Sequence, residues 1–153
     1  MPHTLIIGYG NALRGDDGAG YIVAELLRDK VLDPAIEIVS QHQLTPELME
    51  PISRAAHVIF IDSSVSGRAG KVNRIPLRPA PSCSRYTHHV TPESLLAGSQ
   101  SLYGHTPEAI LYTIPGRFFE TGDELTPSVR RAVNDLVATL EKQFATRAAG
   151  GPA

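Results

Sequence analysis

The sequence predicts a single α/β domain in which helices cover both faces of a twisted, mostly parallel sheet of about five strands, a three-layer αβα architecture. The first reason is that short apolar runs alternate along the chain with longer segments of helical period. The second is size, because 153 residues can bury one core but are too few for two ordinary domains. The third is composition, since 42% hydrophobic and 20% charged residues are typical of a globular protein.

Five apolar runs bounded by turn-forming residues are the predicted strands. They are residues 4–8, 36–40, 58–62, 71–76 and 109–114. Four longer segments are the predicted helices, and the last of them has an apolar stripe with which to pack against the sheet. They are residues 18–29, 46–53, 92–102 and 127–146.

Three of these helices are expected to begin with the same N-terminal capping pattern. A threonine stands before a proline in Thr45-Pro46, Thr91-Pro92 and Thr126-Pro127. A threonine hydroxyl can cap a helix N-terminus, and proline fits the first helical position because its missing N–H would have no partner there. The predicted domain spans residues 1–147, and 148–153 are predicted to form a disordered tail.

Charge and cysteine content exclude several classes of protein. The net charge of −2 provides no basic field for nucleic acid or for an anionic membrane surface. Cys83 is the only cysteine, so neither an internal disulfide nor a cysteine-rich zinc site is expected. The apolar run at residues 4–8 is too short for a signal peptide or a membrane span. We therefore expect a cytoplasmic protein that binds no nucleic acid and no membrane.

The first candidate site is the glycine-rich segment at residues 8–18, which leads from a predicted strand into a predicted helix. It fails the dinucleotide-binding pattern, because the third glycine would fall at Leu13. Asp16 and Asp17 place two carboxylates where a phosphate would sit, so the segment favours a cation over an anion. The alternative is that one of these acids caps the helix, although a cap requires only one side chain.

The second candidate is Asp62, at the carboxyl end of the predicted strand 58–62. Ligands of open α/β sheets bind just beyond the carboxyl ends of the strands, so this carboxylate is expected to point into the usual crevice. The alternative is a structural Asx turn with Ser63 and Ser64.

The third candidate is the pair His88 and His89, which precedes the helix at 92–102. A loop histidine is often a solvated bystander, but imidazole is also a common ligand that can complete a carboxylate site for nickel or zinc. His42 follows the second predicted strand and is a weaker candidate for the same rim of the sheet.

These three segments, in this order, resemble the hydrogenase maturation endopeptidase family. Residues 8–11 (GYGN) and 16–20 (DDGAG) are similar to its opening signature, 58–62 (VIFID) to its central acid-ended strand, and 87–90 (THHV) to its histidine segment. The likeness continues through residues 70–72 (GKV) and 102–104 (LYG). It therefore covers nearly the whole chain up to the final helix, and implies a phosphorylase/hydrolase-like αβα fold.

The resemblance implies an endopeptidase that removes a C-terminal peptide from the nickel-loaded precursor of a nickel-iron hydrogenase large subunit. It assigns the catalytic and nickel-binding positions to Asp17, Asp62 and His88, with His89 as the other candidate for the histidine and Asp16 as a further alternative for the acid. Asp17 stands where the family motif often has glutamate. The nickel would come with the substrate, so an isolated molecule is expected to have an empty site or a surrogate divalent cation there.

Two other functions fit the same residues. One is a self-contained metallohydrolase that uses its own zinc or nickel on a small substrate, and the other is a non-catalytic module that binds the precursor or the metal. The usual protease signatures, His-Glu-x-x-His and Gly-x-Ser-x-Gly, do not occur in the sequence. Cys83 has no flanking catalytic motif and is interpreted as an ordinary loop thiol. The protein is expected to be a monomer that meets its partner transiently.

Overall fold

The middle layer of the protein is a five-stranded sheet in the order β2-β1-β3-β5-β4. The computed structural model describes residues 3–81 and 90–149, of which 146–149 are described by their backbone only. The strands β1, β2, β3 and β5 are parallel, and β4 pairs antiparallel with β5. Their bounds are β1 (Thr4–Tyr9), β2 (Ile36–Gln41), β3 (His57–Ser64), β4 (Asn73–Leu77) and β5 (Glu108–Pro115). The predicted fold class, a single α/β domain with a mostly parallel five-stranded sheet, is confirmed.

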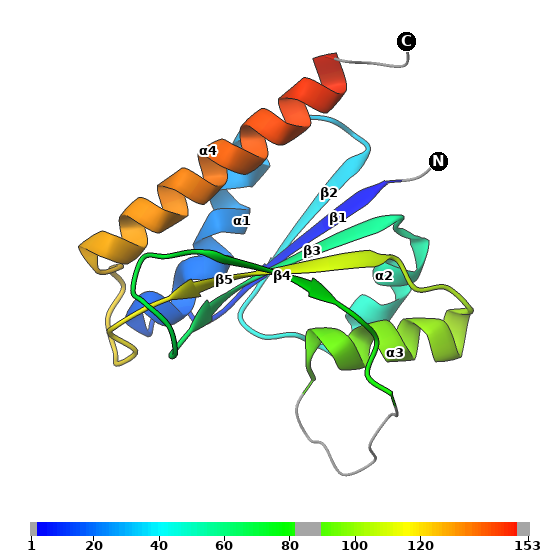
Figure 1. Ribbon diagram of the computed structural model, residues 1–153, viewed down its shortest axis with the longest axis horizontal. Helices are drawn as coiled ribbons and strands as arrows, with labels where there is room; N and C mark the ends of the chain where they lie inside the picture. Colours follow the sequence, from blue (N-terminus) through cyan, green and yellow to red (C-terminus); the bar gives the residue numbers. More distant parts are fainter. Residues whose placement is uncertain (1–2, 82–89, 150–153) are drawn as a thin grey trace.

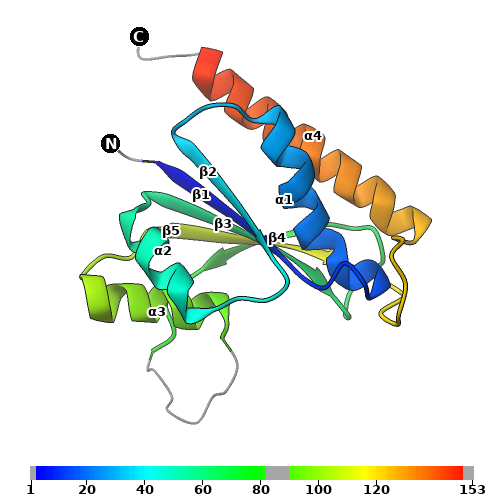
Figure 2. The ribbon, with the colours of Figure 1, turned by 180° about the vertical axis from the view of Figure 1, so that it is seen from behind.

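Helices cover both faces of this sheet (Figure 1). The first face carries α1 (Ala19–Lys30) and α4 (Pro127–Ala149), and the second carries α2 (Met49–Arg54) and α3 (Pro92–Tyr103). The view from behind shows the same two pairs on either side of the sheet (Figure 2). Two short 3-10 turns, η1 (Gly15–Gly18) and η2 (Pro46–Leu48), lead into α1 and α2. All predicted strands and helices are present, and their ends lie within two residues of the predicted ones, except that α4 continues three residues further. The predicted helix 46–53 is divided between η2 and α2.

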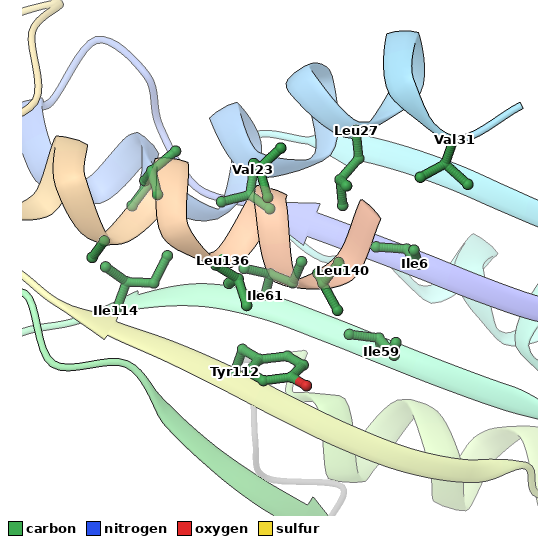
Figure 3. Packing of buried hydrophobic residues seen from close by; sticks show 14 of the residues in the cluster. Ile6, Val23, Leu27, Val31, Ile59, Ile61, Tyr112, Ile114, Leu136 and Leu140 are labelled. Atoms are coloured by element: carbon green, nitrogen blue, oxygen red, sulfur yellow. The ribbon is translucent and has the colours of Figure 1, made fainter. Parts of the chain in front are cut away.

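Alternating side chains of each strand supply two separate cores. Ile59 and Ile61 of β3 pack toward α1 and α4, in the cluster that Figure 3 shows, while Val58 and Phe60 pack toward α2 and α3. Because strand side chains alternate between faces, a strand covered on both sides must be apolar throughout. This explains the unbroken apolar run that precedes Asp62.

Two glycines let α1 lie directly on the sheet. A Cβ atom on Gly8 of β1 would stand 2.1 Å from the carbonyl oxygen of Gly20, and one on Gly20 would stand 2.1 Å from that of Ile61. Both distances are far below van der Waals contact with backbone atoms that cannot move aside. The start of α1 is therefore fixed against β1 and β3.

The threonine caps predicted at three helices occur at one. The Thr91 hydroxyl accepts from the Ser94 N–H at 3.0 Å, in a capping box that begins α3. The Thr45 hydroxyl caps no N–H in the described part of the chain, and the Thr126 hydroxyl donates instead to the Asp16 carboxylate. These two predictions were wrong because each hydroxyl binds a carboxylate instead, that of Glu47 for Thr45 and that of Asp16 for Thr126.

The C-terminal helix α4 ends at Ala149, two residues beyond the predicted end of the domain at 147. The rest of the predicted tail, residues 150–153, lies outside the described residues. No helix in the described ranges is long and apolar enough to cross a membrane.

The chain reverses its direction of progress across the sheet at β1. It passes from β1 to β2 on one side and then to β3 on the other side of β1. The crossover connections diverge at such a switch point and leave a crevice beyond the carboxyl ends of the two strands. β1 leads there to the segment that carries Asp17, and β3 ends there with Asp62 to Ser64.

Candidate active site

A cleft of about 440 Å³ opens at this switch point. Its lining comes from the opening segment, from the loop after β2, from β3 and from Val90, two residues before α3. The lining residues are Tyr9, Gly10, Asp17, His42, Gln43, Leu44, Thr45, Pro46, Asp62 and Val90. The two acids predicted to share a ligand, Asp17 and Asp62, therefore line one cleft although 44 positions of sequence separate them (62 − 17 − 1).

Asp17 is held in the cleft by two neighbours. Its Oδ2 accepts a hydrogen bond from the Asn11 backbone N–H at 2.9 Å, and its Oδ1 accepts from the Ser63 hydroxyl at 3.4 Å. Among the described residues, no carboxylate caps η1 or α1, so the predicted alternative of a helix cap is wrong. The side chain instead joins the opening segment to the end of β3.

Asp62 lies within β3, which continues to Ser64, so the alternative of an Asx turn after the strand is wrong. Its Oδ1 accepts from the Ser63 backbone N–H at 2.7 Å, and the Tyr9 hydroxyl also hydrogen-bonds to the carboxylate. Burial raises the pKa of Asp62 to about 6; the bonds from Ser63 and Tyr9 oppose that shift, and the nearby charge of Asp17 adds to it. The two hydrogen bonds therefore do not fully offset the cost of burying the charged form of Asp62.

Tyr9 is a site residue that the sequence did not point out. Burial is the main cause that raises the pKa of its hydroxyl, and the charge of Asp62 raises it further. The phenol therefore stays protonated and can donate to Asp62 at any ordinary pH. The sequence feature that could have pointed to Tyr9 as a site residue is its position between two motif glycines, Gly8 and Gly10.

Asp16 has a structural role that differs from the position of its neighbour Asp17 in the cleft. Its side chain is buried, with 0% exposure, and its carboxylate accepts four hydrogen bonds from the segment that connects β5 to α4. The donors are the backbone N–H groups of Arg117 (2.8 Å), Phe118 (3.1 Å) and Thr126 (2.8 Å) and the Thr126 hydroxyl (2.8 Å). Asp16 does not line the cleft, and both of its carboxylate oxygens accept hydrogen bonds inside the protein.

These four bonds decide the charge state of Asp16. Burial on its own would raise the pKa of this carboxyl, but the hydrogen bonds outweigh burial and hold the pKa below its ordinary value. The anion is consequently a structural part of the fold. Further bonds run alongside, from the Gly15 N–H to the Gly122 carbonyl and from the Asp16 N–H to the Phe118 carbonyl, both at 2.8 Å.

The histidines of the third predicted segment, His88 and His89, lie outside the described residues, as does Cys83. Val90, the next residue along the chain, lines the cleft. His42 also lines it, as its predicted position on the rim requires, and its ring stacks on that of Tyr21 from α1. Within residues 3–81 and 90–149, no group of three or more His, Cys, Asp or Glu side chains could by itself hold a metal ion.

A larger cleft, of about 580 Å³, lies at the opposite end of the strands, near Thr4, His57 and Glu108. It contains neither of the predicted acids, and its exposed His57–Glu108 contact of 3.3 Å is a surface ion pair at most. Asp17 and Asp62 both line the smaller cleft instead.

The smaller cleft offers two carboxylates to one ligand. Asp17 and Asp62 repel each other unless something positive lies between them, and their oxygens suit a divalent cation. A cation that brings its own ligands would need only these few donors from the protein.

The topology and the cleft define an αβα fold that the protein shares with hydrogenase maturation proteases of known structure. HycI from Thermococcus kodakarensis KOD1 has a TM-score of 0.77 and 19% identity, over 94% of this chain and 92% of that one. HybD from E. coli has a TM-score of 0.72 and 22% identity, over 92% and 93% of the two chains.

A third example, the hydrogenase 2 maturation peptidase from Thaumarchaeota archaeon SCGC_AB-539-E09, has a TM-score of 0.69 and 23% identity, over 95% of this chain and 99% of that one. Each structure is matched over nearly its full length, so the common fold includes all three layers. No protein-family model and no curated protein matches the chain.

Proposed function

We propose that the protein is an endopeptidase that removes a C-terminal peptide from the nickel-loaded precursor of a nickel-iron hydrogenase large subunit. The observation that carries this proposal is the meeting of Asp17 and Asp62 in one cleft at the switch point of the sheet. The fold shared with hydrogenase maturation proteases from three organisms supports the same conclusion.

In this proposal the nickel is part of the substrate. Two carboxylates leave most coordination positions of a cation free, which suits a metal already held by another polypeptide. We propose His88 as the third protein ligand, with His89 as the other candidate, because Val90 lines the cleft and follows both directly in the sequence. Asp16 is the weaker choice of acid, since its four internal hydrogen bonds occupy its oxygens.

The arrangement provides a way to recognise a mature metal centre. A precursor without nickel would bring a peptide to two unneutralised acids, whereas a loaded precursor would bring the cation that relieves their repulsion. Binding of the correct substrate is thereby linked to the presence of metal. The protein would act as a monomer on this partner in the cytoplasm.

The deciding experiment is to incubate the purified protein with a nickel-loaded large-subunit precursor and to measure the mass of the product. A shortened large subunit from loaded precursor only, with intact metal-free precursor, would support the proposal. Hydrolysis of small esters or peptides without any precursor would favour a self-contained metallohydrolase. Stable binding of the precursor without cleavage would favour a non-catalytic module.

Substitution of either cleft acid should abolish processing while the protein stays folded. Asp17→Asn and Asp62→Asn keep the size of the side chain but remove the charge that attracts the cation, so we expect losses of about 100-fold or more. Asp135→Asn, at an exposed position of α4, is the matched control and should process normally. Wild-type rates for both cleft variants would rule out the acids as the metal-recognising groups.

A further inference from the structure

We propose that His42 binds the substrate polypeptide directly, as a contact that determines substrate affinity at the rim of the acidic cleft. This inference rests on the proposed function and adds to it a residue, and a wall of the cleft, that serve peptide binding. Four features of the described residues support it: the two walls of the cleft, the stack on Tyr21, the free ring nitrogens and the anchored loop.

The cleft has one acidic wall and one neutral polar wall. Asp17 and Asp62 belong to the first, while the loop after β2 supplies the second with the polar side chains of His42, Gln43 and Thr45, between which lie the apolar Leu44 and Pro46. A substrate that carries a cation on a peptide needs both kinds of surface. The acids suit the cation, and uncharged donors and acceptors suit the amide groups of the adjoining chain.

The His42 ring is held in place although the residue is exposed. It stacks on the Tyr21 ring of α1 with 5.4 Å between the ring centroids and 1° between the planes. This separation lies within the usual range for aromatic pairs. An exposed side chain that is already ordered loses less entropy when it binds a ligand, so the stack prepares the imidazole for binding.

Both nitrogens of this ring are available to a ligand. The stack on Tyr21 is the contact that the structure gives the His42 ring, and no described residue hydrogen-bonds or ion-pairs with either nitrogen. A neutral imidazole offers one donor and one acceptor, which matches the C=O and N–H of a peptide group. The ring therefore has the chemistry of a contact to the main chain.

The loop that carries His42 is anchored at several points. The Gly10 N–H donates to the Gln41 carbonyl at 3.1 Å, which ties the start of the loop to the opening segment. Leu44 is buried in the core with 7% exposure, and the Leu48 N–H donates to the Thr45 carbonyl at 3.1 Å. The loop that forms the polar wall is therefore already held in place in the absence of a substrate.

His42 is not simply a third ligand for the metal. Asp17, Asp62 and His42 all line the cleft, yet among the described residues they do not form a group that could hold one ion. The imidazole belongs to the loop after β2, whereas the two acids come from η1 and from β3. Its loss should weaken binding of the substrate and leave the chemical step intact.

The test is steady-state processing of the nickel-loaded precursor, with kcat and KM determined separately. For His42→Ala we expect a KM roughly three- to tenfold higher, the value of about one lost hydrogen bond, with kcat changed less than about twofold. His57→Ala, at the opposite end of the sheet, is the matched control. An unchanged KM, or a loss confined to kcat, would overturn the inference.

The stack provides a second and independent test. Tyr21→Leu should raise KM in the same direction, because it removes the ring that orders His42, whereas Tyr21→Phe keeps a ring to stack on and should retain most of the wild-type affinity. The double variant His42→Ala with Tyr21→Leu should be no worse than His42→Ala alone. Additive losses would mean that Tyr21 does not act through His42 and would contradict the positioning role.

The two hypotheses can fail separately. If wild-type protein does not shorten the loaded precursor at all, the proposed function is wrong. If it does, and His42→Ala has wild-type KM while Asp62→Asn is inactive, the function stands and the substrate contact is wrong.

Discussion

Asp16 and Asp62 are two buried or half-buried carboxylates in the same protein, with opposite surroundings. Four donors surround Asp16, so its charged form is favoured and its pKa is lowered. Asp62 has Ser63 and Tyr9 as donors and another acid nearby, and burial raises its pKa to about 6. The same side chain thus serves the fold at Asp16, whereas at Asp62 its poorly compensated charge is available for the cation that the proposed function requires.

The largest effect on stability should come from Asp16→Asn. The amide would direct an NH₂ group at backbone N–H groups that now donate to an anion, leaving buried donors without partners. We expect the free energy of unfolding to fall by about 2–4 kcal/mol at pH 7, measured by urea denaturation. Asp123→Asn, an exposed acid in the same connecting segment, is the control.

The contribution of Asp16 has a defined pH dependence. Because its folded pKa is lowered, the stabilisation is complete above the ordinary pKa of 3.8 and is lost as the pH falls through the folded value. A wild-type-like stability of Asp16→Asn at neutral pH would show that the four bonds add nothing, and the contrast with Asp62 would disappear.

The opposite sign is expected for Asp62→Asn. A raised folded pKa means that stability is lost as the pH rises from the ordinary value of 3.8 through about 6, so the charged Asp62 destabilises the protein at neutral pH. The amide cannot ionise, and the free energy of unfolding at pH 7.5 should rise by about 1–3 kcal/mol. The gain should vanish near pH 4, where wild-type Asp62 is protonated.

A stability that is equal for wild type and Asp62→Asn at both pH values would contradict this reading of the cleft. The combination to look for is a variant that is more stable and yet inactive. That combination is expected of residues kept for function at a cost to the fold.

A smaller effect is expected for Thr126→Val. This change removes one of the four donors to Asp16 but keeps the Thr126 N–H, whose bond to Oδ1 is 2.8 Å long. The loss should be about 1–2 kcal/mol in the free energy of unfolding, from one hydrogen bond to a charged acceptor. Thr121→Val, at an exposed position of the same segment, should change stability by less than about 0.5 kcal/mol. Equal effects of the two variants would mean that the Asp16–Thr126 bond is not specific.

The elements of the fold could be predicted from the sequence because apolar period and punctuation are local signals. The convergence of Asp17 and Asp62 was also predictable, since a parallel sheet brings the carboxyl ends of its strands to one edge. Neither inference required knowledge of side-chain partners.

The role of Asp16 could not be predicted in this way, because its donors lie at positions 117, 118 and 126. The sequence wrongly predicts a helix cap at Thr126 for the same reason, since the partner of this threonine is more than 100 residues away. The stack of Tyr21 on His42 joins a helix to the loop after the next strand, and depends on where the two elements pack. Such contacts are set by tertiary packing and leave no periodic trace in the sequence.

The two glycines at the interface of α1 with the sheet have a consequence for the spacing of the cleft. Since Gly8 and Gly20 allow backbone to lie against backbone, the start of α1 lies as close to the sheet as it can. The 3-10 turn η1, which carries Asp17 and leads into α1, is held close to the sheet with it. A side chain at either position would lift that turn and widen the separation of the two acids. If the proposed function is correct, the size of the residues at these two positions in other proteins with this topology should therefore set how large an ion the two acids can bind together.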